Sequence, residues 1–357
     1  MRRLMTRALV LGLALLLALP AGAEEYLVTD PPALTAAPSP APVPSFITTP
    51  TPFADYPALG RDGFLEKPLS NNGPAFIHVD VDAGHWIYIS TDLRVEIQRC
   101  IYKEPRRQRI YYFIADVRFK GGDFFRAYSK NPAKPDKDLD KPENIARQYN
   151  LVYAQNGDLF TWRIEEKRYP GLIIRNSSVV RDQTYDKATV NGPPLDELSL
   201  YPDGHMEMRS PGEFSADDYL QKGALDVLAF GPLLLKNSQL DERVLGSHFR
   251  SLEPRSAIGF KAPGHFVGIL VEGRNQRSAG AGLLFVARRL LEEGCSEAFT
   301  LDGGQTAAMI FMGDIVMDPG TYSGYTKTRR QPDVIGIGVT RQTIEKPKQR
   351  TNKDQSP

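Results

Sequence analysis

The stretch Ala298-Phe-Thr-Leu-Asp-Gly-Gly-Gln-Thr306 joins a short apolar segment to an abrupt break. Phe299 and Leu301 are apolar and Thr300 is β-branched, a composition typical of a buried strand. Asp302 and the two glycines after it end that strand, and glycines allow backbone to approach a ligand closely. Side chains at strand ends often form sites. The turn is therefore a candidate site, although the stretch taken alone favours a tight turn with a solvated aspartate.

The residues around this turn predict a strand–helix–strand unit. The clearest helix covers Gly282 to Glu293 and ends at Gly294, the usual position for a left-handed glycine. Strands are predicted at 266–271 before it and 297–301 after it, and such a connection favours parallel strands. The predicted buried stripe of the helix consists of Leu283, Val286, Ala287 and Leu290.

The part of the chain before this unit is rich in strands. Apolar residues alternate in 86–90 and in 93–100, and 110–119 is a further long strand candidate. A second helix is predicted over 216–224, introduced by Ser215. The expected fold class is α+β, with a twisted mixed β-sheet, helices packed against it and a β-rich N-terminal part.

Composition limits the classes of function. The chain has 357 residues and a formal net charge of +1, long enough for one large domain or two small ones. A near-neutral chain has no electrostatic basis for nucleic-acid binding. The basic run 103–109 is interpreted as a solvated hairpin loop. No nucleic-acid partner is expected.

The N-terminus has the three parts of a secretion signal. Residues 8–19 are apolar apart from one glycine, and Ala21-Gly-Ala23 is a typical cleavage site. The apolar part is too short for a comfortable membrane span. The positive charges before it are Arg2, Arg3 and Arg7. We expect residues 1–23 to be a signal peptide, the protein to be secreted or located in the cell envelope, and no transmembrane anchor to remain after cleavage.

The remaining sequence predicts a linker, one domain and a tail. Residues 24–59 contain a Pro-rich run at 36–44, which favours extended polyproline geometry over a packed core. We expect the folded domain at 60–341 and a disordered tail at 342–357. The two cysteines, Cys100 and Cys295, both lie in apolar contexts. A disulfide in an exported protein and two buried free thiols both remain open.

Four motifs in sequence order resemble those of a known family. They are Arg255-Ser-Ala-Ile-Gly259, Glu272-Gly-Arg274, a helix opened by Gly280-Ala-Gly282, and Leu301-Asp-Gly-Gly304. Together they resemble the phosphodiester glycosidase family, to which the uncovering enzyme of the mannose 6-phosphate pathway belongs. The resemblance extends over about residues 150–340. Gln305 and Thr306 stand where the family usually has Gly-Ser, so the fit to a substrate is expected to differ.

The resemblance implies an exported hydrolase that cleaves the glycosidic bond of sugar-1-phosphodiesters. Its substrate would be a phosphorylated glycan of the cell envelope or an exopolysaccharide, and no cofactor is expected. The acids at matching positions are Asp302, Glu272 and Asp158, and they are the candidate catalytic residues. A carboxylate near the anomeric carbon suits an oxocarbenium-like transition state. The residues alone do not assign nucleophile, base and stabiliser among the three.

The resemblance also implies a set of substrate-binding residues. Arg255 lies in an apolar strand, where its charge needs either a structural carboxylate or a substrate phosphate. Asn156, followed by Gly157, is a second candidate, and the pair is equally typical of a hairpin turn. The amides of Gly303 and Gly304 are expected to face the phosphate. The full predicted set is Arg255, Asn156, Arg274, Gly303, Gly304 and Thr306.

One further cluster predicts a different chemistry. His78, Asp80 and Asp82 alternate along one strand, with His85 nearby, which is a pattern of metal ligands. A solvent-facing strand edge explains the same alternation. Two alternatives to the hydrolase therefore stay open. One is a metal-dependent phosphodiesterase that uses this cluster, and the other, based on Gln305 and Thr306, is a non-catalytic glycan-binding module of the same fold.

Overall fold

The computed structural model describes residues 56–69, 73–103, 109–122, 124–182, 195–246, 249–322 and 325–340. All of them belong to one compact unit. The predictions about the signal peptide, the Pro-rich run and the C-terminal tail lie outside these ranges, as does the prediction for residues 104–108 of the basic run 103–109. Within the described residues, no helix is long and apolar enough to span a membrane.

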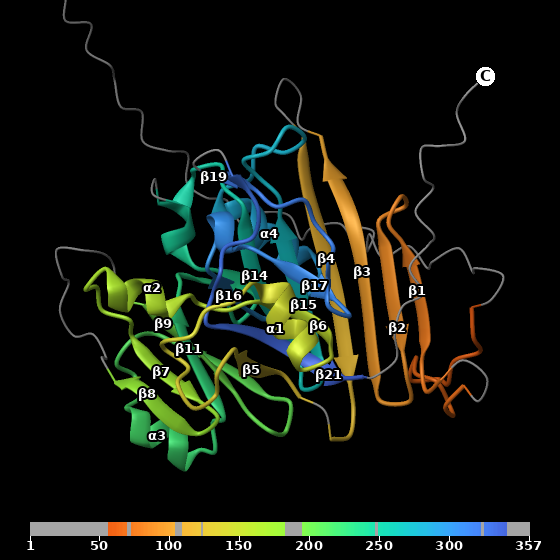
Figure 1. The fold of residues 1–357 in the computed structure, drawn as a ribbon, viewed down its shortest axis with the longest axis horizontal. Helices are drawn as coiled ribbons and strands as arrows, with labels where there is room; N and C mark the ends of the chain where they lie inside the picture. Colours follow the sequence, from red (N-terminus) through yellow and green to blue (C-terminus); the bar gives the residue numbers. More distant parts are fainter. Residues whose placement is uncertain are drawn as a thin grey trace, which may run out of the picture. The chain divides into compact units, whose positions relative to one another are not determined.

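A large antiparallel sheet forms the framework of this unit (Figure 1). Its strands, in spatial order, are β1 (Phe76–Asp80), β2 (His85–Ile89), β3 (Leu93–Tyr102), β4 (Ile110–Phe119), β15 (His265–Val271), β14 (Arg255–Ala262), β16 (Glu297–Leu301), β12 (Leu233–Lys236) and β13 (Gln239–Leu240). The expected strands of the N-terminal part are confirmed as β2, β3 and β4.

Two smaller sheets accompany the large one. One has the order β10 (Met206–Arg209), β9 (Asp196–Leu200), β11 (Asp226–Phe230), β7 (Leu172–Arg175) and β8 (Ser178–Asp182). The other has the order β18 (Asp314–Ile315), β17 (Met309–Phe311), β6 (Leu151–Asn156), β21 (Asp333–Val339) and β5 (Arg126–Ser129). A separate short pair joins β19 (Thr321–Tyr322) and β20 (Tyr325–Thr326).

The helices of the described residues are short. They are α1 (Pro142–Gln148), α2 (Phe160–Glu165), α3 (Ala216–Gln221) and α4 (Leu283–Glu292), with 3₁₀ turns η1 (Glu242–Leu245) and η3 (Gly304–Thr306). The second predicted helix is confirmed as α3. Ser215 and Asp218 form its capping box, in which each side chain hydrogen-bonds the backbone of the other.

The strand–helix–strand unit is present, but the prediction of a mixed sheet is wrong. Both β15 and β16 pair antiparallel with β14, which lies between them. They therefore run in the same direction without being neighbours, because α4 carries the chain across β14. Every strand pair in the described part of the chain is antiparallel.

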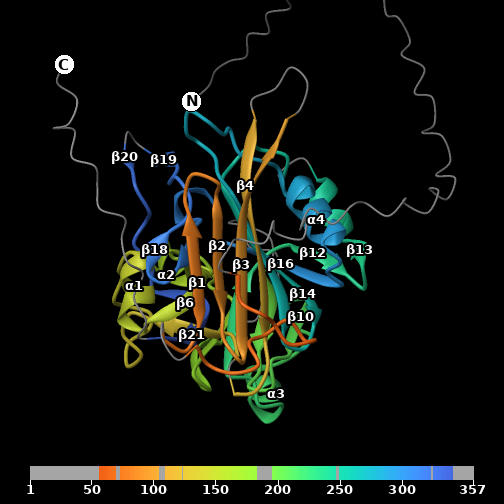
Figure 2. The ribbon, with the colours of Figure 1, turned by 90° about the vertical axis from the view of Figure 1, so that its right-hand side faces the viewer.

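The large sheet has packed layers on both faces. Figure 2 shows α4 on one face, and β6, β21 and α1 on the other. The buried residues of α4 are Leu283, Val286, Ala287 and Leu290, as the helical spacing predicts. On the opposite face, Gln155 of β6 donates hydrogen bonds to the hydroxyl of Ser256 and to the carbonyl of Ile269. This buried amide fixes the register between the two sheets.

The two cysteines are free thiols. Cys295 lies against Gly259 of β14, where its Sγ would be 2.5 Å from an added Cβ. Gly259 pairs with Val267, which pairs with Asp116 of β4. Cys100 pairs with Tyr112, four residues away along β4, so the thiols occupy different rows of the sheet. Burial raises the pKa of Cys100 to about 11, consistent with a small apolar residue rather than a reactive one.

Candidate functional site

The candidate site lies where β16 ends. Ser256 pairs with Leu301, and Arg255 pairs with Val271, so the end of β16, the start of β14 and the end of β15 meet at one edge of the large sheet. Asp302 and Glu272 follow these ends two strands apart, which separates their backbones by roughly 10 Å. The edge therefore brings together three of the four motifs that resemble the family.

Asp302 is partly buried at this edge. Burial raises its pKa to about 6, and the nearby Thr306 hydroxyl, the guanidinium groups of Arg163 and Arg329, and the amide of Gly303 limit that rise. The Gly303 amide donates to Asp302 Oδ1 at 2.9 Å. The Thr306 hydroxyl is buried and makes no well-aligned hydrogen bond. Asp302 thus has a carboxyl group that titrates near neutral pH and two cations within electrostatic reach.

Asn156 joins the end of β6 to the Asp302 turn. Its amide nitrogen donates to the carbonyls of Gly157 at 3.0 Å and Asp302 at 2.8 Å, and its oxygen accepts from the Ala308 amide at 3.0 Å. The side chain is fully buried. The hairpin interpretation of Asn156-Gly157 is wrong, because β6 is followed by α2. Asn156 positions the turn, since its amide hydrogens already have partners.

Asp158 is fully buried in an ion-pair network behind the turn. Its Oδ1 accepts from Arg175 Nη2 at 3.0 Å and its Oδ2 from the Ala229 amide at 2.9 Å. Arg175 also donates through Nε to Asp333 Oδ2 at 2.6 Å. Arg163 donates to the Asp158 carbonyl at 2.6 Å. Asp158 therefore anchors two arginines that do not reach solvent.

Glu272 is also buried and engaged. Arg277 holds it with a bidentate pair of hydrogen bonds, one of them from Nε at 2.7 Å. The Asp318 amide donates to its Oε1 at 2.8 Å. Such charge-assisted pairs are strong and geometrically specific. Glu272 therefore closes the turn at the end of β15 and attaches the loop at 318 to it.

The two predicted arginines occupy different places. Arg255 donates through Nε to the Ala281 carbonyl at 3.1 Å and through Nη2 to the Ser251 carbonyl at 3.0 Å. Desolvation lowers its pKa, and Asp302 is not among the charges that act on it. Arg274 has its guanidinium beside Gly304, 3.4 Å from where a Cβ would lie. Arg274 therefore borders the Asp302 turn at Gly304, and the side chain of Arg255 borders it at Gly303, with its Cδ 3.8 Å from where a Cβ would lie.

Four glycines of the motifs, Gly273, Gly280, Gly282 and Gly303, pack closely against one backbone segment, 249–255. An added Cβ would be 2.8 Å from the Pro254 carbonyl oxygen at Gly303 and 2.5 Å from the Glu253 backbone at Gly280. The Gly304 amide donates to that same Pro254 carbonyl at 2.9 Å. The amides of Gly303 and Gly304 are thus already hydrogen-bonded, to Asp302 and Pro254, so they do not present free donors to a phosphate.

This packing predicts a stability cost at Gly280. Gly280→Ala adds a Cβ against the backbone of Glu253 at a position with φ +103°. We expect the free energy of unfolding to fall by about 1–3 kcal/mol through overpacking, beyond the backbone strain. Gly212→Ala is the matched control, since Gly212 has φ +78° and open space around it. Urea denaturation measures both, and equal losses would contradict the packing role.

The cluster around His78 does not converge on one point. His85 pairs with Glu96 of β3, with 3.1 Å between Nε2 and Oε1. Asp80 accepts from the Ala83 amide at 2.8 Å within the turn that joins β1 and β2. Within the described residues, no group of three or more His, Cys, Asp and Glu side chains is arranged to hold a metal ion. The metal interpretation of His78, Asp80, Asp82 and His85 therefore has no support in the geometry.

Comparison with known proteins identifies the family. The phosphodiester glycosidase family model matches residues 149–338, more than half of the chain. The chain belongs to the phosphodiester glycosidase family. The uncharacterised protein YomE of Bacillus subtilis (strain 168), derived from prophage SPbeta, is 32% identical over 163 residues, which are 45% of this chain and 24% of that protein. The chain thus spans about a quarter of the length of that relative.

A solved structure supports the same fold. The catalytic domain of zebrafish N-acetylglucosamine-1-phosphodiester alpha-N-acetylglucosaminidase, auto-inhibited by its pro-peptide, superimposes with a TM-score of 0.55. The match covers 70% of this chain and 84% of that chain at 17% sequence identity. The residues described around Asp302 fall within 149–338, the range that the family model matches.

Three charged residues near Asp302 were absent from the sequence prediction. Arg163 lies on α2 and Arg329 precedes β21, and both act on the pKa of Asp302. Asp333, the first residue of β21, completes the network with Arg175. Asp333 directly precedes the apolar run 334–337, just as Asp302 directly follows a buried strand. Its position in the sequence could therefore have marked it as a candidate. The two arginines carried no such signal, since they lie in polar stretches typical of any surface.

Proposed function

We propose that this phosphodiester glycosidase hydrolyses the anomeric C–O bond of sugar-1-phosphodiesters, with Asp302 as the carboxylate at the anomeric carbon. Membership of the family supports glycosidase activity on phosphodiester-linked sugars. The observation that carries the assignment is the state of Asp302: partly exposed at a sheet edge, with a pKa raised to about 6 and two arginines nearby. A perturbed carboxyl group beside cations is a mark of catalytic sites.

Cleavage of this C–O bond requires little general-acid catalysis. A phosphodiester spreads the charge of the leaving oxygen, so protonation of that oxygen matters less than in an ordinary glycoside. When the C–O bond breaks, its electron pair stays with the phosphate and a positive charge develops on the sugar. Water supplies the new hydroxyl and loses one proton. Asp302 would stabilise the sugar cation, and Arg329 and Arg274 would hold the phosphate.

The other predicted acids then have positioning roles. Asp158 and Glu272 are fully paired with Arg175 and Arg277, so neither has a free oxygen edge for substrate. Thr306 remains a substrate-binding candidate, because its hydroxyl is buried beside Asp302 without a well-aligned partner. A buried hydroxyl in this state gains free energy when a ligand supplies a hydrogen bond.

The biological setting is part of this proposal. The signal-like N-terminus and the Pro-rich run suggest export to the cell envelope or the medium, where phosphate-linked glycans and exopolysaccharides occur. Mass spectrometry of the extracellular protein should give a mature N-terminus near Glu24. A retained Met1 on extracellular protein would contradict this part alone.

The activity test determines which bond of the substrate is cleaved. Purified protein is incubated with the methyl phosphodiester of a hexose 1-phosphate in ¹⁸O-labelled water, and the products are analysed by phosphorus NMR and mass spectrometry. Cleavage at the anomeric carbon places ¹⁸O in the sugar and leaves methyl phosphate. Label in the phosphate would instead indicate a phosphodiesterase. Binding without turnover over a panel of sugars would indicate a glycan-binding module.

The pKa of Asp302 predicts a pH profile. If Asp302 acts ionised, kcat/KM should fall about tenfold per pH unit below pH 6 and level off above it. Stability should change in the opposite sense. A carboxyl pKa raised from 3.8 to about 6 contributes stability below pH 4 that is lost as pH rises through 6. An activity profile that stays flat from pH 5 to 7 would contradict the role.

A further inference from the structure

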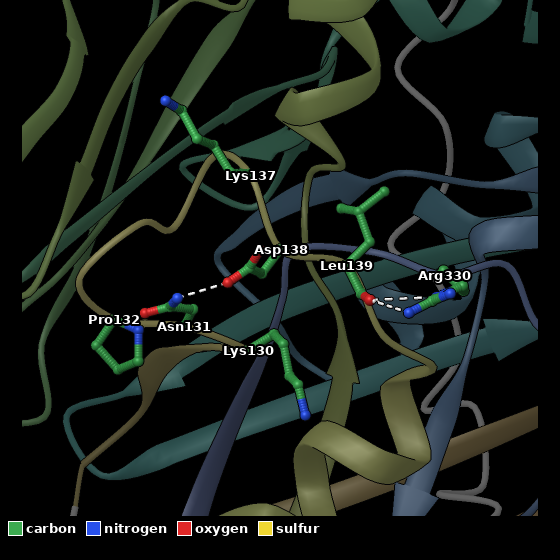
Figure 3. A pocket seen from close by; sticks show the side chains of 7 residues that line it. All are labelled: Lys130, Asn131, Pro132, Lys137, Asp138, Leu139 and Arg330. Carbon is green, nitrogen blue, oxygen red and sulfur yellow. Dashed lines mark hydrogen bonds between the residues drawn. The ribbon is translucent and has the colours of Figure 1, made fainter.

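An open cleft of about 650 Å³ lies between the loop 130–139 and Arg330, the residue that follows Arg329. Figure 3 shows Asn131 at one end, Asp138 in the middle, and Leu139 with Arg330 at the other end. Because the cleft is open to solvent, it can contact one part of an extended molecule without enclosing it.

The charge of this cleft is predominantly positive. Three cations line it, Lys130, Lys137 and Arg330, with Asp138 as the only acid among its lining residues. Asp138 accepts a hydrogen bond from Asn131 Nδ2. Lys130 is paired with a carboxylate outside the cleft, Asp140. Two cations, Lys137 and Arg330, remain without a carboxylate partner in the described part of the chain.

The guanidinium of Arg330 is held in one orientation before any ligand binds. Its Nε and Nη2 both donate to the carbonyl oxygen of Leu139, at 3.1 and 2.7 Å (Figure 3). A neutral carbonyl fixes the plane of the guanidinium without cancelling its charge. A planar, fixed guanidinium is well suited to bind a phosphate oxygen, and Lys137 adds a flexible point charge.

The cleft and the candidate site share one segment of backbone. The Arg329 amide donates to the Gln305 carbonyl at 3.1 Å, and the Arg329 charge acts on Asp302. Gln331 pairs with Asp140 in an isolated antiparallel bridge. Arg329 therefore acts on the Asp302 turn, while the next residue, Arg330, lines the cleft.

We propose that this cleft binds a second phosphate of the substrate, at least one repeat away from the bond that is cleaved. The inference rests on the proposed function and extends it. It assigns the substrate to polymeric sugar phosphates, in which phosphodiester groups recur along the chain, rather than to isolated diesters. Each phosphate bound by a cation releases a counterion, so affinity for such a chain depends on salt.

The test compares a polymer with its smallest unit. The probes are a synthetic oligomer of four hexose 1-phosphate units and the methyl phosphodiester of one unit. We expect Lys137→Gln combined with Arg330→Gln to lower kcat/KM on the oligomer about tenfold, mainly through KM, and to leave the single diester unchanged. Lys134→Gln is the control, because Lys134 lies in the same loop outside the lining residues. Equal losses on both substrates would overturn the proposal, and so would no loss on the oligomer.

A binding measurement tests the proposed second phosphate site independently of catalysis. Fluorescence anisotropy of the labelled oligomer with Asp302→Asn protein should show affinity that falls with salt. Lys137→Gln alone, which breaks no contact of the loop, should reduce the salt slope by about 1. If the wild-type protein cleaves neither substrate but the affinity for the oligomer depends on salt in this way, the proposed function is wrong and the anion-binding site is supported. Equal competition by a single-stranded oligonucleotide would show an unspecific polyanion surface and overturn the proposal.

Discussion

Asp302→Asn is expected to reduce turnover at least about 100-fold while leaving the fold intact. The loss corresponds to removing one well-aimed electrostatic group from a transition state. The substitution keeps the oxygen that accepts from the Gly303 amide. It also removes a partly buried charge whose pKa is raised, so at pH 7 the variant should be more stable, by on the order of 1 kcal/mol after allowing for solvent screening. Steady-state kinetics and urea denaturation at pH 7 measure both effects.

The matched control for this variant is Asp314→Asn. Asp314 lies in β18 and pairs with Arg147 at the surface, with 3.1 Å between Asp314 Oδ1 and Arg147 Nη2. Exposed pairs contribute about 0–1 kcal/mol, and the pair does not border Asp302. Turnover should therefore be unchanged. Near-wild-type turnover by folded Asp302→Asn would refute the catalytic assignment, and Thr306 and Arg274 would then be tested as residues of a binding site.

Arg175→Leu is expected to destabilise the protein by about 3–5 kcal/mol. Arg175 is buried between Asp158 and Asp333, whose carboxylates would both lose their cation in the variant. Breaking a buried pair from one side leaves uncompensated charge, which is the costly case. The surrounding carboxylates raise the pKa of Arg175 despite its burial, so it stays charged at all accessible pH values. Chemical denaturation followed by circular dichroism measures the loss.

Arg181→Leu provides the comparison on the next strand. Arg181 of β8 pairs with Asp136 but is more than a third exposed, so its removal should cost about 1 kcal/mol or less. If Arg175→Leu does not fold, Arg175→Lys reports on the same network, since it keeps the charge and loses the planar fork. A loss below about 1 kcal/mol for either Arg175 variant would show that the network contributes little to stability.

The elements that the sequence predicts well are those whose pattern is local. The stripe of α4 and the end of β16 depend on the spacing of apolar residues within one element, and both are confirmed. The mixed sheet was a wrong expectation because strand pairing is decided by the whole chain. A helix between two strands of the same direction does not reveal that β14, from earlier in the sequence, lies between them.

The charged residues of the candidate site were likewise predictable only where a local sequence pattern marks them. Asp302 follows a buried strand, and it became a candidate only through the neighbouring motifs that resemble the family. Arg255 could not be placed, because its surroundings on the α4 side come from residues 251 and 281. Arg163 and Arg329 come from segments more than 150 residues apart, and no local pattern marks either as a partner of Asp302. Gly303 and Gly304 were expected to face a phosphate, but their amides donate to Asp302 and to the Pro254 carbonyl.

The pairing of β4 with β15 has a consequence for how this chain can be divided. The family match begins at residue 149, after β4 has ended. Seven residue pairs join β15 to β4, from His265 with Arg118 to Val271 with Tyr112. A fragment trimmed to the matched residues would leave β15 as a long apolar edge strand with unpaired amides and carbonyls, a template for intermolecular association. The strands outside the match thus protect the matched segment from self-association.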